Sequence, residues 1–80
     1  MTIPLALYST SHCHLCEQAE DLLVLAAKNN DIEWNVIEIT EHLELLTRYE
    51  VKIPVLQRLD SLSEICWPFD TADIIRLLKS

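Results

Sequence analysis

The chain has 80 residues, half of them hydrophobic, which is enough for a single globular domain over residues 1–80. Its net charge of −7, with six scattered basic residues, excludes the basic stripe that a nucleic-acid-binding surface requires. No apolar run approaches the ~20 residues that span a bilayer, and the first residues lack a basic region and a cleavage site, so we expect neither membrane binding nor a signal peptide. We therefore expect a cytoplasmic monomer. In that compartment, close cysteine pairs are more often catalytic or metal-binding than structural.

The chain contains no glycine. This excludes glycine-rich phosphate loops and dinucleotide fingerprints, so no nucleotide cofactor is expected. Tight turns must use other residues, and 29–31 (Asn-Asn-Asp) and 60–61 (Asp-Ser) are the candidates, because Asn and Asp best tolerate unusual backbone angles.

Hydrophobic periodicity predicts elements in the order β-α-β-α-β-β-α. In chain order they are a strand at 3–8, a helix at about 14–29, a strand at 32–39, a short helix from Thr40, a strand at 51–56 with Pro54 near its start, a strand at 62–67 and a helix capped by Asp70. The first two strands should be parallel, because a helix connects them, and the last two should form a hairpin. The expected fold class is α/β, with a four-stranded mixed sheet covered by helices on both faces.

The same patterns predict which side chains are buried. Leu15 belongs to the apolar face of the first helix and Leu43 to that of the short helix. Cys66, between Ile65 and Trp67, is expected to be a small buried side chain. Lys52 and Arg58 flank the third strand and are expected to be solvated.

Cys13 and Cys16 are three residues apart, where the first strand runs into the first helix. The unpaired amides and the dipole of a helix N-terminus favour a thiolate, which is the reactive form of cysteine. Cys13 comes first and should lie at the helix cap, so we assign it as the attacking thiolate. Cys16 lies one turn further in and should resolve the mixed disulfide.

Charged neighbours should modulate this pair. His12 and His14 would stabilise a thiolate at Cys13 when protonated. The acidic residues of the first turns, Glu17, Glu20 and Asp21, oppose it but are expected to point to solvent. We expect the helix terminus to dominate.

Four segments together resemble a glutaredoxin of the thioredoxin fold, and in particular the small bacterial glutaredoxin-like proteins. They are Tyr8-Ser9, the Cys13-x-x-Cys16 pair, Ile53-Pro54 and the loop 67–70 (Trp-Pro-Phe-Asp). The resemblance covers essentially the whole chain. It implies a thioredoxin-like fold and a thiol–disulfide oxidoreductase that exchanges a dithiol with protein or small-molecule disulfides or with glutathione mixed disulfides.

The chain departs from glutaredoxins in two places. His14-Leu15 replaces the usual Pro-Tyr between the cysteines, and the glycine pair that lets glutathione approach the backbone is missing. The missing glycines weigh against glutathione binding. Glutathione remains a candidate co-substrate, and no bound cofactor is expected.

The resemblance also implies the remaining site residues. A cis Ile53-Pro54 bond would place Pro54 beside the cysteine pair and leave the Ile53 backbone to pair with an extended substrate. Around it we expect substrate contacts from six further residues, some of which form an anion site at the last helix. They are Tyr8, His14, Lys52, Phe69, Asp70 and Thr71.

Two other functions stay open. His12, Cys13, His14 and Cys16 form a short run of metal-ligand residue types, although no second ligand cluster follows downstream. Alternatively, the domain is a non-catalytic module for protein contact, against which the intact cysteine pair argues.

Overall fold

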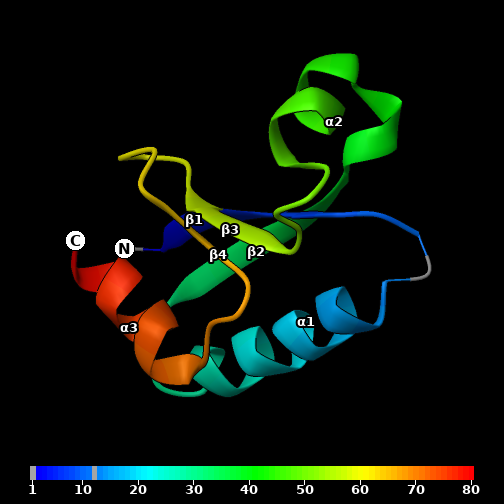
Figure 1. Cartoon of the computed structure of the whole chain (residues 1–80). Coiled ribbons are helices and arrows are strands. Elements are labelled where there is room, and N and C mark those ends of the chain that lie inside the picture. Colours follow the sequence, from blue (N-terminus) through cyan, green and yellow to red (C-terminus); the bar gives the residue numbers. More distant parts are fainter. Residues whose placement is uncertain (1, 12) are drawn as a thin grey trace.

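The computed structural model describes residues 2–11 and 13–80. The elements are β1 (Ile3–Ser9), α1 (His14–Ala27), β2 (Ile32–Glu38), the 3-10 helix η1 (Ile39–Glu41), α2 (Leu43–Tyr49), β3 (Val55–Arg58), β4 (Glu64–Cys66) and α3 (Thr71–Lys79) (Figure 1). The predicted order is confirmed. No helix of the described residues is long and apolar enough to cross a membrane.

The four strands form one mixed sheet in the order β2-β1-β3-β4. β1 pairs in parallel with β2, whereas β1–β3 and β3–β4 are antiparallel, as predicted. α1 and α3 cover one face of the sheet and α2 covers the other (Figure 1). This three-layer arrangement confirms the expected α/β fold with helices on both faces.

The central strand β1 is apolar on both sides because both sides are covered. Successive strand side chains point to opposite faces. Leu5 and Leu7 therefore enter the core under α1 and α3, while Ala6 and Tyr8 enter the core under α2.

The short helix after β2 and the start of β3 both differ from the prediction. The predicted helix from Thr40 divides into η1 and α2, and Leu43 is 78% exposed because the buried side of α2 is formed by its later residues. β3 begins only at Val55, since the amides of Lys52 and Ile53 both bond back to the Tyr49 carbonyl and end α2.

The turn of the β3–β4 hairpin also differs from the prediction in which residue adopts an unusual backbone conformation. Among the described residues only Leu62 has a positive φ, of 64°, so an exposed leucine and not an Asn or Asp adopts the left-handed conformation. The flanking bonds, Arg58 N to the Ser63 carbonyl and Leu62 N to the Arg58 carbonyl, close the turn around it.

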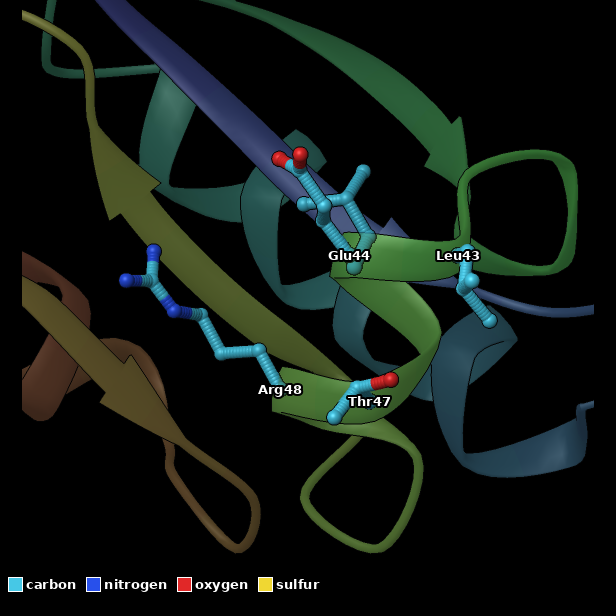
Figure 2. Close-up of a pocket in the computed structure, with 5 residues that line it drawn as sticks. Leu43, Glu44, Thr47 and Arg48 are labelled. Atoms are coloured by element: carbon cyan, nitrogen blue, oxygen red, sulfur yellow. The ribbon is translucent and has the colours of Figure 1, made fainter.

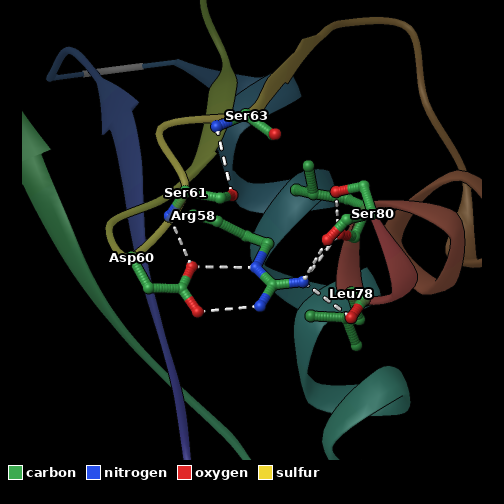
Figure 3. A network of polar contacts seen from close by, with 7 residues as sticks. Arg58, Asp60, Ser61, Ser63, Leu78 and Ser80 are labelled. Carbon is green, nitrogen blue, oxygen red and sulfur yellow. Dashed lines mark hydrogen bonds and ion pairs between the residues drawn. The ribbon is translucent and has the colours of Figure 1, made fainter.

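Arg58 ties this hairpin to the end of α3 (Figure 3). Its guanidinium donates hydrogen bonds to the carbonyls of Leu77, Leu78 and Ser80 at 2.7–3.2 Å. It donates two further hydrogen bonds to the Asp60 carboxylate. Its side chain is only 12% exposed, so the prediction that Arg58 is solvated was wrong. Cations stabilise the unpaired carbonyls of a helix C-terminus, which explains the burial.

Substitutions of two leucines in α1 test the description of the core under α1 and α3. Leu23 is fully buried and Leu25 is 49% exposed in the same helix. We expect Leu23→Ala to lower the free energy of unfolding by about 2–5 kcal/mol, because it removes buried methyl groups and leaves a cavity. Leu25→Ala, the same substitution on the outer side, should cost less than about 1 kcal/mol. Urea unfolding of the two variants makes the comparison, and equal losses would contradict this description of the core.

Candidate redox site

The cysteine pair occupies the first turn of α1. Cys13 is the N-cap residue, with an extended backbone, and its Sγ accepts a hydrogen bond from the Cys16 amide at 3.1 Å. The two residues form a disulfide, with their Cα atoms 5.2 Å apart. The predicted location of Cys13 at the helix cap is confirmed.

The two sulfurs differ in access to solvent. Cys13 is partly exposed, whereas Cys16 is 7% exposed and packs into the domain. A bulky disulfide substrate can therefore approach Cys13 much more readily than Cys16.

The loop that carries Cys13 is held by a carboxylate from β2. Glu38 accepts hydrogen bonds from the Ser11 hydroxyl at 2.9 Å and from the Thr40 hydroxyl at 2.9 Å. The bonds from Ser11 and then Thr40 lower the pKa of Glu38 to about 2. Local sequence gives no sign of this contact, because Ser11 and Glu38 are 27 residues apart.

Ile53 and Pro54 lie directly before β3. Their peptide bond is cis, and Pro54 is fully buried. Because Tyr8 pairs with Val55, the antiparallel register carries Pro54 alongside Ser9 at the end of β1. The Ile53 amide already donates to the Tyr49 carbonyl at 3.2 Å, so only its carbonyl is left for a substrate.

Tyr8 lies inside the core and not at the surface. It is 7% exposed, stacks on Tyr49 with ring centroids 4.6 Å apart, and donates its hydroxyl to Gln57 at 2.7 Å. Burial raises the pKa of its phenol. The expected substrate contact by Tyr8 was therefore wrong, because strand alternation turns this side chain under α2.

Two predicted contact residues are at the surface. Lys52 is exposed in the loop after α2, and His14 is exposed at the start of α1 with Nδ1 3.8 Å from the Glu17 carboxylate. Leu15 is 43% exposed between the cysteines, so the prediction that it is buried was wrong. His12 lies outside the described residues.

The anion site expected at the loop before α3 stays a prediction, and the charges there oppose it. Phe69 is 6% exposed and packs edge-on against Trp67, so it belongs to the core. Asp70 caps α3, as predicted, in a reciprocal capping box with Asp73. The two carboxylates at this terminus repel an anion, and Thr71 beside them is partly exposed.

Cys66 corrects another prediction. It is exposed on the edge strand β4, where the expectation was a buried thiol. Strand alternation explains the difference, because Ile65 packs against the core under α1 and α3 and Cys66 faces the other side of the sheet. Within the described residues, no three His, Cys, Asp or Glu side chains are placed to share a metal ion.

A cavity of about 130 Å³ opens beside the cysteine pair. Its lining combines both cysteines with residues from β1, α1 and β2: Leu7, Ser9, Thr10, Cys13, Cys16, Glu17, Glu20 and Val36. Sequence reasoning did not assign Ser9, Thr10 or Val36 to the site. For Glu20 the sequence did contain a signal, because its helical spacing from Cys13 and Cys16 places it on the same side of α1.

A larger hollow of about 510 Å³ lies over α2. Its lining includes Leu43, Glu44, Thr47 and Arg48. Figure 2 shows that these side chains point away from the helix in different directions and do not converge. Small-molecule sites usually bring a few polar groups together, so this hollow is a poor candidate for one.

The Glu38 contact predicts a specific acid response. A carboxylate with a lowered pKa stabilises the fold above its ordinary value of about 4.3, and this contribution is lost as the pH falls toward about 2. We expect Glu38→Gln to flatten the loss of stability between pH 5 and pH 2. Glu33→Gln, an exposed change on the same strand, is the control. Urea midpoints across this range give the comparison, and identical slopes for both variants would refute the role of Glu38.

Comparison with known proteins identifies a family that matches almost the whole chain. Residues 4–79 match the model of the glutaredoxin-like domain (DUF836) family. A search of curated proteins gives no match.

Solved structures from two bacteria are similar in sequence and fold. The X-ray structure of XcR50 from X. campestris is 31% identical, covers 94% of this chain and 95% of its own, and has a TM-score of 0.82. The solution structure of Ne2328 from Nitrosomonas europaea is also 31% identical, with coverage of 92% and 87% and a TM-score of 0.81.

A more distant neighbour shows the fold alone. Thioredoxin 1 from Thermosipho africanus TCF52B is 20% identical, with coverage of 96% and 91% and a TM-score of 0.70. With a capped cysteine pair, a cis-proline before β3 and the family match over 4–79, the chain belongs to the glutaredoxin-like domain family and has the thioredoxin fold.

Proposed function

We propose that the protein is a thiol–disulfide oxidoreductase that uses Cys13 and Cys16 as its redox pair. The observation that carries the proposal is the bond from the Cys16 amide to the Cys13 sulfur at the N-terminus of α1. Backbone amides and the helix dipole stabilise a thiolate at this position, which makes Cys13 the better nucleophile near neutral pH.

The exchange takes two steps. In the reduced protein, the Cys13 thiolate attacks one sulfur of a substrate disulfide, forms a mixed disulfide and releases the other sulfur as a thiolate, which is protonated. The Cys16 thiol then loses its proton and attacks the Cys13 sulfur, forming the Cys13–Cys16 disulfide and releasing the second substrate thiol. Two electrons pass from the protein to the substrate. The exposure of Cys13 and the burial of Cys16 support this order.

We extend the proposal to the substrates and the cellular setting of this exchange. We favour protein disulfides as substrates, with glutathione as a second candidate and a dithiol reductant to restore the pair. The proposal places the protein, as a monomer in the cytoplasm, in electron transfer for redox homeostasis. It assigns no bound cofactor.

Single-cysteine variants test the proposal. Reduced wild-type protein should reduce bis(2-hydroxyethyl) disulfide, and Cys13→Ser should abolish the reaction because the attacking sulfur is gone. In the Cys16→Ser variant, Cys13 should still attack the disulfide, and the resulting mixed disulfide should accumulate because no thiol resolves it; mass spectrometry after acid quenching detects it.

Cys66→Ser is the matched control, since Cys66 is the remaining thiol and is exposed. It should react at the wild-type rate. A mixed disulfide that accumulates on Cys16 of the Cys13→Ser variant would reverse the order of attack. A wild-type protein inert toward disulfides would contradict the proposed function.

A further inference from the structure

The first turn of α1 begins with a weak cap. Helices usually start at Ser, Thr, Asp or Asn, whose side-chain oxygen accepts a hydrogen bond from an amide of the first turn. Here the N-cap residue is Cys13, and sulfur is a weaker acceptor than oxygen. The bond from the Cys16 amide therefore holds the backbone of Cys13 less firmly than an oxygen cap would. The position of Cys13 depends on how the preceding loop is held.

A contact between that loop and β2 lies two residues before Cys13. The Ser11 hydroxyl donates a hydrogen bond to Oε1 of Glu38 at 2.9 Å. Two residues of extended chain span at most about 7 Å, so fixing Ser11 confines Cys13 to a small region at the start of α1. The contact is present while the disulfide between Cys13 and Cys16 is closed, so it is compatible with the geometry of the redox pair.

Glu38 is itself a fixed point. Its backbone pairs with Ser9 at the end of the parallel β1–β2 ladder, and the next residue, Ile39, is 1% exposed in the core under α2. Its second carboxylate oxygen, Oε2, accepts hydrogen bonds from the hydroxyl of Thr40 at 2.9 Å and from the amide of Thr40 at 3.4 Å. The carboxylate thus joins the loop before α1 to a rigid part of the sheet.

The charge of Glu38 strengthens this contact. The bonds from Ser11 and then Thr40 lower the pKa of Glu38 to about 2, so the side chain is ionised wherever thiols exchange. Hydrogen bonds to a charged acceptor are stronger than those between neutral groups.

We propose that Glu38 is a positioning residue for the redox pair, which acts through Ser11 to hold Cys13 at the N-cap of α1. There the Cys16 amide stabilises the thiolate of Cys13. Without the contact, Cys13 leaves the cap for part of the time, and the average stabilisation of its thiolate falls. This inference rests on the proposed function and names a further residue on which the reactivity of the same site depends.

The Ser11→Ala substitution removes the contact and leaves the Glu38 carboxylate in place. It is made in the Cys16→Ser/Cys66→Ser variant, in which Cys13 is the single cysteine, and thiolate absorbance at 240 nm gives the pKa of Cys13. We expect this pKa to rise by about 0.5, a threefold change in the ionisation constant, as for the loss of one hydrogen bond.

The other charged groups near the thiol are the same in every variant of this comparison. They are His14, Glu17 and Glu20 of α1 and Glu38 of β2. A difference in the pKa of Cys13 therefore reports its position and not a change of charge. Ser11→Thr, which keeps a hydroxyl, should restore the pKa of the parent variant.

A second hydroxyl–carboxylate contact provides the matched control. Thr2 donates to the Asp31 carboxylate at 3.1 Å, is also exposed, and joins the same two strands at their opposite end. Thr2→Val should leave the pKa of Cys13 unchanged. An equal rise in Thr2→Val and Ser11→Ala would show a general loosening of the fold and would overturn the inference.

A double-mutant cycle tests whether Ser11 acts through Glu38. Glu38→Ala removes a negative charge together with the contact, so its own effect on the pKa of Cys13 combines two causes. Adding Ser11→Ala to Glu38→Ala should change the pKa no further, because the contact is already lost. A second rise as large as the first would show that Ser11 acts without Glu38, which contradicts the proposed positioning.

The outcomes separate this inference from the proposed function. A wild-type protein that is inert toward bis(2-hydroxyethyl) disulfide contradicts the exchange itself. A wild-type protein that reduces this disulfide, combined with a Cys13 pKa that Ser11→Ala leaves unchanged, contradicts only the positioning role of Glu38.

Discussion

The hydrogen bond from the Cys16 amide to the Cys13 sulfur links the fold of this domain to its chemistry. In structural terms it is a helix cap, which satisfies one of the amides that the first turn of α1 leaves unpaired. In chemical terms the same amide lies where negative charge develops when the Cys13 thiol ionises. In the proposed function, the residue that begins the helix is thus also the residue whose reactivity the helix increases, and the cap must be held in place for both purposes.

The sheet provides that support. β1 is the central strand, paired with β2 on one side and β3 on the other, and it delivers the loop with Cys13 at a defined point. Glu38 at the end of β2 holds the loop through Ser11, and the register of β3 carries Pro54 to the end of β1. The cavity beside the cysteine pair is lined from β1, α1 and β2, so it opens at the same junction of β1 and α1.

Local patterns predicted the elements well. The alternation in β1, the helix start at the cysteines, the cap at Asp70 and the hairpin at 60–61 depend on neighbouring residues, and they were read correctly from the sequence. The errors concern contacts between distant segments. Leu43 is exposed because the later residues of α2 form its buried side, and Cys66 is exposed on the edge strand β4. Tyr8 is buried under α2, and Arg58 bonds to carbonyls about twenty residues away. The support from Glu38 and the cavity wall at Val36 likewise depend on the pairing of β1 with β2, which periodicity alone does not place at atomic detail.

The most direct test of this account is the pKa of the Cys13 thiol. It can be measured from thiolate absorbance at 240 nm in a Cys16→Ser/Cys66→Ser variant, in which Cys13 is the single cysteine. Stabilisation by the start of α1 predicts a pKa well below the ~8.5 of an unperturbed thiol. A titration midpoint near 8.5 in the folded variant would contradict the claim that the helix N-terminus activates this cysteine.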